Sequence, residues 1–279
     1  MIKKTFDLFI FSSLFIALCA VLMVNQVHSL FHLVYPSNKY LLFVFFSTLA
    51  SYNFHWYLTP DNISEIERCS WSRQHKELHL TLTLLGTGGA LYFILYFTQH
   101  WLALGVAAIL TFLYSAPKIP HPLFHRLKRI AVGKTFYLSF VWLYVTTILP
   151  FIFTKTHFTM FELAFCFSRF LLIYAICIIF DYRDRNNDKK EGIRSLIGFL
   201  REKQINFIFY CSLFLFLVFN VWLGTRYLNW DIIASLTLPG LILVYLYPKT
   251  KNNFSDYLYY FVLDGLMALS SLITLFISI

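Results

Sequence analysis

The stretch "FLLIYAICIIFDYRDRNNDKKEGIRS", residues 170–195, joins a run of apolar side chains to a dense group of acidic and basic ones. The apolar part belongs to a run that starts near residue 161 and is long enough to cross the hydrocarbon core of a bilayer as a helix. The charged part follows immediately, at the point where such a helix would leave the membrane. We therefore expect an integral membrane protein with a charged site at the end of one of its spans.

The composition of the whole chain supports this expectation. The 279 residues are 58% hydrophobic and only 13% charged, which lies outside the balance of ordinary soluble domains. The net charge of +9 is compatible with nucleic acid, but nucleic-acid binders gather their cations on a soluble face, and here the cations fall between apolar runs. The five cysteines form no CxxC pair and indicate neither a disulfide framework nor a zinc site.

Apolar runs of sufficient length predict an all-α bundle of about nine transmembrane helices. The first run resembles a secretory signal, but its length favours a retained span. The boundary between the third and fourth spans is the weakest, so eight spans remain an alternative. No change in composition marks a domain boundary, and we expect one transmembrane domain over residues 1–279. The expected spans are 6–25, 39–58, 78–97, 101–116, 135–153, 161–180, 206–223, 231–247 and 257–277.

The distribution of lysine and arginine predicts the orientation in the membrane. Of the 23 basic residues, 19 lie at the N-terminus and in the loops after the second, fourth, sixth and eighth spans. The opposite loops hold only Lys39, Lys155 and Arg226. Because cations accumulate in cytoplasmic loops, we expect a cytoplasmic N-terminus, an outer C-terminus and an odd number of spans in a cell (inner) membrane.

Three aspartates follow the sixth expected span at a regular spacing. Asp181, Asp184 and Asp188 fall at i, i+3 and i+7, so their carboxylates share one face if the helix continues past the membrane. Like charges at this spacing repel unless they share a cation. Mg²⁺ takes one or two carboxylates and completes its shell with water and phosphate oxygens. Lys190 and Arg194 follow closely and offer donors to a diphosphate leaving group.

The same spacing also fits a simpler interpretation, in which this stretch is a solvated cytoplasmic loop. Asp181 would then pair with Arg185 at i, i+4, and the other charged side chains would face water. The spacing alone favours neither interpretation.

The second aspartate motif resembles that of the UbiA superfamily of intramembrane prenyltransferases. That family has DxxDxxxD followed by a tail of the form K-x-G-I-[KR]-[ST], and this chain has "DYRDRNND" followed by "KKEGIRS". The family also carries a YxxxK element after its fourth helix, which "YSAPK" matches with Tyr114 and Lys118. Nine helices with the motif loops on the cytoplasmic side is likewise the plan of the family.

The first aspartate motif departs from the family. The family closes its second helix with NDxxDxxxD, which holds the other half of the magnesium–diphosphate site, and this chain has "NFHWYLTPD" at 53–61. Asn53 and Asp61 remain, but Phe54 and Tyr57 replace carboxylates, and aromatic rings do not ligate a hard cation. Asn53 fits an interhelical hydrogen bond equally well, and Asp61 fits the first turn of a short interfacial helix.

Ionisable residues inside the expected spans are costly and face the bundle interior or a cavity. Arg169 and Glu162 lie on roughly one face of the sixth span, which favours a structural ion pair over a substrate-facing arginine. Asp264 in the last span fits a cavity-facing contact with substrate and a hydrogen bond to a neighbouring helix equally well. The "GTGGA" at 86–90 favours close helix packing over a phosphate loop.

The resemblance implies a magnesium-dependent enzyme that transfers a prenyl group from a polyprenyl diphosphate to a lipophilic, aromatic acceptor. The alternative is a catalytically degenerate relative that binds a prenyl lipid or a partner without turnover, because the first motif has lost two carboxylates. A small carrier is disfavoured, since no paired broken helices are evident. The expected partners are the diphosphate, the acceptor and membrane lipid, without nucleic acid. The resemblance also implies the roles of single residues. Mg²⁺ is held by Asp181, Asp184 and Asp188. The leaving phosphate is stabilised by Lys118, Lys190 and Arg194, and the substrate is contacted by Asn53, Asp61, Tyr114 and Asp264.

Overall fold

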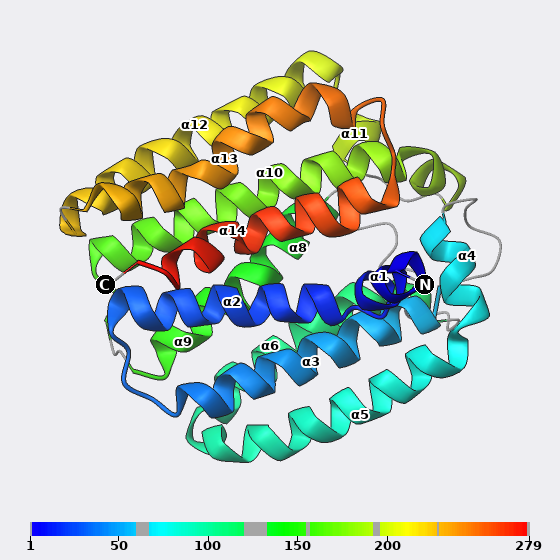
Figure 1. The fold of residues 1–279 in the computed structure, drawn as a ribbon, viewed down its shortest axis with the longest axis horizontal. Helices are drawn as coiled ribbons and strands as arrows, with labels where there is room; N and C mark the ends of the chain where they lie inside the picture. Colours follow the sequence, from blue (N-terminus) through cyan, green and yellow to red (C-terminus); the bar gives the residue numbers. More distant parts are fainter. Residues whose placement is uncertain are drawn as a thin grey trace.

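Helices form every regular element in the computed structural model, which describes residues 2–59, 67–119, 133–154, 157–191, 196–227 and 229–277. The long helices lie side by side as a bundle, with α10 passing through its middle (Figure 1). This confirms the expected all-α fold. The helices are α1 (Ile2–Phe11), α2 (Leu14–Phe31), α3 (Ser37–Tyr57), α4 (Glu67–Gln74), α5 (Lys76–Ile94), α6 (Trp101–Ser115), α8 (Lys134–Leu143), α9 (Leu149–Ile152), α10 (Met160–Glu191), α11 (Leu196–Phe199), α12 (Glu202–Tyr227), α13 (Trp230–Thr250) and α14 (Asp264–Thr274). Short 3₁₀ turns η1 (Leu95–His100) and η2 (Ala116–Lys118) and π-helical turns η4 (Tyr144–Ile148) and η5 (Leu258–Leu263) join some of them.

Six helical segments of the described chain are long and apolar enough to cross a membrane by length and composition. They make this a multi-pass membrane protein. The segments do not include α3, which carries several polar side chains, or the shorter apolar segment Leu258–Thr274. The count of nine spans therefore stays a prediction. The six are Leu14–Phe31, Lys76–Lys118, Lys134–Ile152, Met160–Arg185, Glu202–Thr225 and Trp230–Thr250.

The long run Lys76–Lys118 folds back on itself. Phe97 leaves helical geometry at φ −129° within the 3₁₀ turn between α5 and α6. His79 near the start of the run contacts Asn53, and Lys118 at its end contacts Thr59, so both ends lie at the C-terminal end of α3. The run thus forms two antiparallel helices, in line with the separate spans expected at 78–97 and 101–116.

The first expected span is wrong in its placement. A single helix over 6–25 is expected, but the chain breaks at Ser12 and Ser13, where Ser13 adopts the left-handed φ of 66°. The break frees polar groups for contacts with other elements. The Ser12 carbonyl accepts from Asn53 Nδ2 at 2.9 Å, and Ser13 Oγ accepts from Arg68 at 3.3 Å. These contacts stabilise a backbone conformation that is unfavourable for a residue other than glycine.

The small residues of "GTGGA" bring α5 against α3, as the sequence predicts. A Cβ at Gly86 would lie 2.7 Å from Ala50 N and 2.8 Å from the Phe46 carbonyl, and one at Gly89 would meet the Phe46 ring. A Cβ at Gly88 would meet nothing within 4 Å. Two of the three glycines therefore allow the backbones to approach closely, which is a common device for packing helices in membranes.

We predict that Gly86→Ala lowers the free energy of unfolding by about 1–3 kcal/mol, because its Cβ forces the two helix backbones apart. Gly88→Ala is the matched control and should be neutral or stabilising by up to about 1 kcal/mol, since alanine favours helix more than glycine. Thermal unfolding in detergent measures both changes. Equal melting temperatures for the two variants would contradict this account of the α3–α5 contact.

A buried polar network lies away from the aspartate motif. Arg169 of α10 donates to Gln26 Oε1 of α2 at 2.5 Å, and the same oxygen accepts from Ser271 of α14 at 3.1 Å. Glu162 instead accepts from the Thr159 backbone N–H at 2.5 Å. The expected pairing of Arg169 with Glu162 is therefore wrong. A neutral amide on another helix serves as the acceptor and ties three helices together.

Candidate functional site

The aspartate motif lies where α10 continues beyond its apolar part. Asp181 is 3% exposed and accepts from Thr135 Oγ1 at 2.5 Å, while Asp184 Oδ2 lies 3.6 Å from Lys134 Nζ. Because Lys134 and Thr135 are adjacent at the start of α8, the two carboxylates face the same neighbouring element. This is the shared face that the spacing of the motif predicts.

Several predicted site residues cannot be placed in this geometry. The side chains of Asp188 and Lys190 belong to the part of α10 for which the structure describes the backbone alone. Asp61 and Arg194 lie outside the described residues. The roles expected for these four residues stay predictions.

The basic neighbours of Asp184 differ from those of a solvated loop. Arg183 Nε lies 3.3 Å from Asp184 Oδ1, and its NH1 lies 4.0 Å from Asp256 Oδ1. The hydrogen bond that the structure shows for Asp181 comes from Thr135, whereas Arg185 is exposed. The motif therefore belongs to a packed charged cluster between helices, which the simpler interpretation does not account for.

The YxxxK element packs on the last turns of α3. The Tyr114 ring stacks on His55 with 5.1 Å between the ring centres, and Lys118 Nζ donates to Thr59 Oγ1 at 2.6 Å. Lys118 is also close enough to Asp184 to act on its charge. The element thus brings a tyrosine and a lysine from α6 and η2 to the end of the bundle where α10 carries the aspartate motif. We call this end the mouth of the bundle.

Arg68 is a site residue that the sequence analysis missed. It lies on α4 and is 3% exposed, with its guanidinium 4.3 Å from the Trp56 ring centre and 4.0 Å from that of Tyr260. Its backbone N–H donates to Asp256 Oδ2 at 2.8 Å. The aromatic residues of the degenerate first motif were the available sequence signal for a nearby cation, since a ring such as Trp56 attracts one. Nothing in the sequence indicated that Arg68 would also contact Tyr260.

Burial shifts the ionisation of this cluster outside the spans. It raises the pKa of Asp256, although the hydrogen bond from the Arg68 N–H and the charge of Arg183 act in the opposite direction. Burial also lowers the pKa of the Arg68 guanidinium. Arg68 and Asp256 are both buried, so charge interactions within the cluster are strong.

Asn53 is buried and holds three elements together. Its Nδ2 donates to the carbonyls of Ser12 at 2.9 Å and Leu49 at 2.8 Å, and its Oδ1 lies 2.6 Å from His79 Nδ1. Both of its N–H groups are thus used within the protein. This arrangement favours the interhelical hydrogen bond over the expected contact with substrate.

We predict that Asn53→Ala lowers the free energy of unfolding by about 1–3 kcal/mol, because it leaves the Ser12 carbonyl and His79 without their buried partner. Asn38→Ala, at an exposed position of the same helix, is the matched control and should change little. Thermal unfolding of both variants provides the measurement. If Asn53→Ala melts like the wild type and binds substrate more weakly, the result would instead support a substrate contact for Asn53.

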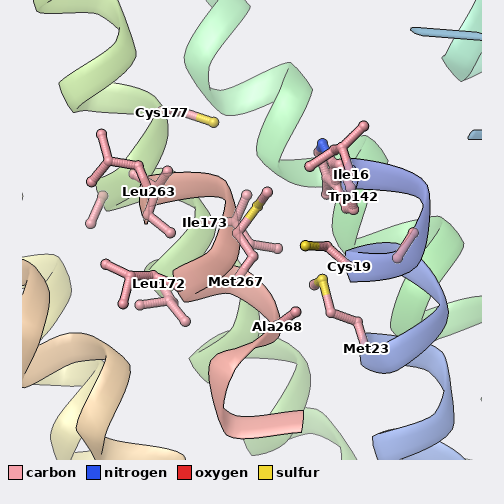
Figure 2. Packing of buried hydrophobic residues seen from close by; sticks show 14 of the residues in the cluster. Ile16, Cys19, Met23, Trp142, Leu172, Ile173, Cys177, Leu263, Met267 and Ala268 are labelled. Carbon is pink, nitrogen blue, oxygen red and sulfur yellow. The ribbon is translucent and has the colours of Figure 1, made fainter. Parts of the chain in front are cut away.

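Asp264 occupies the interior of the bundle at the start of α14. It is 8% exposed, follows the π-helical turn η5, and makes no hydrogen bond or ion pair with the described residues. It lies within electrostatic reach of Cys19, Tyr52 and Cys177. Figure 2 shows Cys19 and Cys177 around the start of this helix. The arrangement lacks the interhelical hydrogen bond that was the alternative for Asp264, and π-helical turns are frequent at functional sites.

The charge of Asp264 acts on groups in two regions. Asp264 lies within electrostatic reach of Cys177 and Tyr52, and also of Arg68 and Arg183 beside the motif. The Tyr52 hydroxyl accepts from Trp142 Nε1 at 3.1 Å.

The motif offers two described carboxylates to a metal ion. No group of three His, Cys, Asp or Glu side chains in the described part of the chain is arranged to hold a metal. Mg²⁺ requires only one or two carboxylates when waters and phosphate oxygens complete its shell, and Asp181 and Asp184 would supply two. In the first-motif stretch, the Trp56 ring lies beside the Arg68 guanidinium.

The model of the UbiA prenyltransferase family matches residues 72–263. The chain therefore belongs to this family, whose members are membrane prenyltransferases. The matched residues include the YxxxK element and the second aspartate motif, and they begin after the degenerate first motif at 53–61. Neither the curated proteins nor the solved structures yield a match.

Proposed function

We propose that the chain transfers a prenyl group from a polyprenyl diphosphate to a lipophilic, aromatic acceptor within the membrane. Membership of the UbiA prenyltransferase family supports prenyl transfer in general. The observation that carries the specific proposal is the pair Asp181 and Asp184, which face Lys134 and Thr135 at the end of a buried apolar helix. Two carboxylates beside buried cations suit a metal-bound diphosphate better than any uncharged lipid.

The diphosphate end of the substrate would occupy the mouth of the bundle. Mg²⁺, when bound, neutralises phosphate oxygens and favours departure of the diphosphate. The amines of Lys118 and Lys134 contact Thr59 and Asp184, and they would balance further negative charge. In the proposed site Asp181, Asp184 and Asp188 hold the metal, and Lys190 and Arg194 join the two lysines around the diphosphate.

The reaction would proceed from the mouth toward the bundle interior. The allylic carbon–oxygen bond breaks, its electron pair leaves with the diphosphate, and the acceptor forms the new bond and loses a proton. Tyr52 lies within electrostatic reach of both Tyr114 and Asp264, and these aromatic rings would stabilise an allylic cation formed beside them. We assign the substrate contacts beside them to Tyr114 and Asp264, with Asp61 as a further contact at the mouth.

The distribution of cations supports a cytoplasmic site. The N-terminal helix α1 lies at the end of the bundle that also holds the end of α10, whereas α14 ends at the opposite end (Figure 1). We propose that the N-terminus and the aspartate motif face the cytoplasm of a cell (inner) membrane and that the C-terminus lies outside. A water-soluble diphosphate head group could then enter without crossing the bilayer.

A second candidate function has its own observation. Phe54 and Tyr57 replace carboxylates of the first motif, which favours a relative that binds a prenyl diphosphate lipid without turning it over. Both functions need the diphosphate site, and they differ in whether the allylic carbon–oxygen bond breaks. Release of diphosphate from bound substrate separates them.

We predict that Asp184→Asn lowers the rate of diphosphate release from farnesyl or geranylgeranyl diphosphate by at least about 100-fold, because the metal loses a charged ligand. Asp231→Asn is the matched control, since Asp231 is exposed at the start of α13, far from the motif. The assay follows labelled diphosphate with Mg²⁺ and a panel of aromatic acceptors. Full activity in Asp184→Asn would refute the proposed site.

We also predict that removing divalent metal with a chelator stops release and that Mg²⁺ restores it, because the phosphate charge then lacks its counter-ion. The melting temperature of the metal-free protein should show that it stays folded. Binding of the prenyl diphosphate without release, in the presence of Mg²⁺ and many acceptors, would favour the second function. Metal-independent release would contradict the role given to the aspartates.

A further inference from the structure

Cations lie around Trp56, an aromatic residue within the degenerate first motif. The Trp56 ring, which belongs to the degenerate motif, lies 4.3 Å from the Arg68 guanidinium and 5.6 Å from Lys118 Nζ. The Tyr260 ring lies 4.0 Å from Arg68 and 4.4 Å from the guanidinium of Arg183. Two aromatic rings thus connect the lysine of the YxxxK element, Arg68 and the arginine beside Asp184 in one continuous surface.

Among the described residues no carboxylate forms an ion pair with the Arg68 guanidinium, although Asp264 and Asp256 lie within electrostatic reach of it. Its NH2 donates to Ser13 Oγ at 3.3 Å, and its buried Nε has no hydrogen-bond partner there. Asp256 accepts from the backbone N–H of Arg68 at 2.8 Å and pairs with Arg183. A buried cation with an unsatisfied N–H is costly, so this group needs an anion to complete its contacts.

The rings determine which kind of anion fits. The Trp56 and Tyr260 ring centres lie 4.3 and 4.0 Å from the Arg68 guanidinium, and the two rings are nearly perpendicular, at 79°. The guanidinium can therefore stack on only one of the rings, and it keeps a buried Nε–H that has no partner among the described residues. This planar fork matches the oxygens of a phosphate group, with which arginine forms paired hydrogen bonds. Arg183, whose guanidinium lies 4.4 Å from the Tyr260 ring centre, contacts Asp184 at 3.3 Å and so connects this group of cations to the aspartate motif.

We propose that Arg68 replaces metal binding on the first-motif side of the site. The diphosphate would be held by one divalent ion on α10 and, from the α3–α4 side, by the Arg68 guanidinium with Lys118. This inference rests on the proposed function. It adds to that function one bound metal ion per chain and a diphosphate contact from Arg68.

The test uses the purified full-length protein in detergent, with inorganic pyrophosphate as the diphosphate probe and Mn²⁺ as the spin-active stand-in for Mg²⁺. Electron paramagnetic resonance counts the bound Mn²⁺, and calorimetry measures pyrophosphate binding. We expect one Mn²⁺ per chain at saturating pyrophosphate. Arg68→Gln should weaken pyrophosphate binding at least about tenfold and leave the Mn²⁺ count at one.

Two further variants separate binding from folding. Arg73→Gln changes an exposed arginine of the same helix and should bind pyrophosphate as the wild type does. Arg68→Lys retains the charge but loses the planar fork, and should bind with intermediate affinity. If Arg68 only clamps helices together, both Arg68 variants will melt at lower temperature and bind pyrophosphate normally while folded, which overturns the inference.

The remaining outcomes distinguish the inference from the function on which it rests. Two Mn²⁺ ions per chain, or undiminished pyrophosphate binding in Arg68→Gln, would overturn the inference and leave the prenyltransferase proposal standing. If the wild-type protein binds no pyrophosphate with Mn²⁺, the proposed diphosphate site itself is wrong.

Discussion

The cost of burying charge at the mouth of an apolar bundle governs the arrangement of the site. Asp181, Asp184 and Arg183 sit at the end of α10, where a charge without a partner would be expensive. Each has a partner on another element, such as Thr135 and Lys134 at the start of α8. The charged groups thereby fix the relative positions of helices that apolar packing alone would leave free to slide, because lipid provides no hydrophobic drive between helices.

The helix break near the N-terminus serves the same site. A continuous first helix would bond its own backbone at Ser12, and the carbonyl would not reach Asn53. The left-handed Ser13 instead presents its hydroxyl to Arg68. Local strain at this position is offset by two contacts that hold α3 and α4 at the mouth, which is where strained backbone is usually found in functional proteins.

Local sequence patterns predicted what depends on neighbouring residues. Apolar runs located the long helices except the first, which breaks at Ser12 and Ser13. The i, i+3 spacing of Asp181 and Asp184 predicted their common face, and the glycines of 86–90 predicted the close α3–α5 contact. Contacts between residues far apart in the chain could not be predicted from the sequence. Arg169 could not be assigned to Gln26, because several polar residues compete as partners and only the packed helices select one. The break at Ser12 carries no glycine or proline signal.

The degenerate first motif is best understood as one coordinated change. The family pattern has carboxylates at positions 54 and 57, and this chain has Phe54 and Tyr57 there. In the same stretch the Trp56 ring lies 4.3 Å from the Arg68 guanidinium, so this part of α3 now favours a cation. In the proposed site that cation would supply the attraction for diphosphate that carboxylates and their metal ion supply in the family pattern.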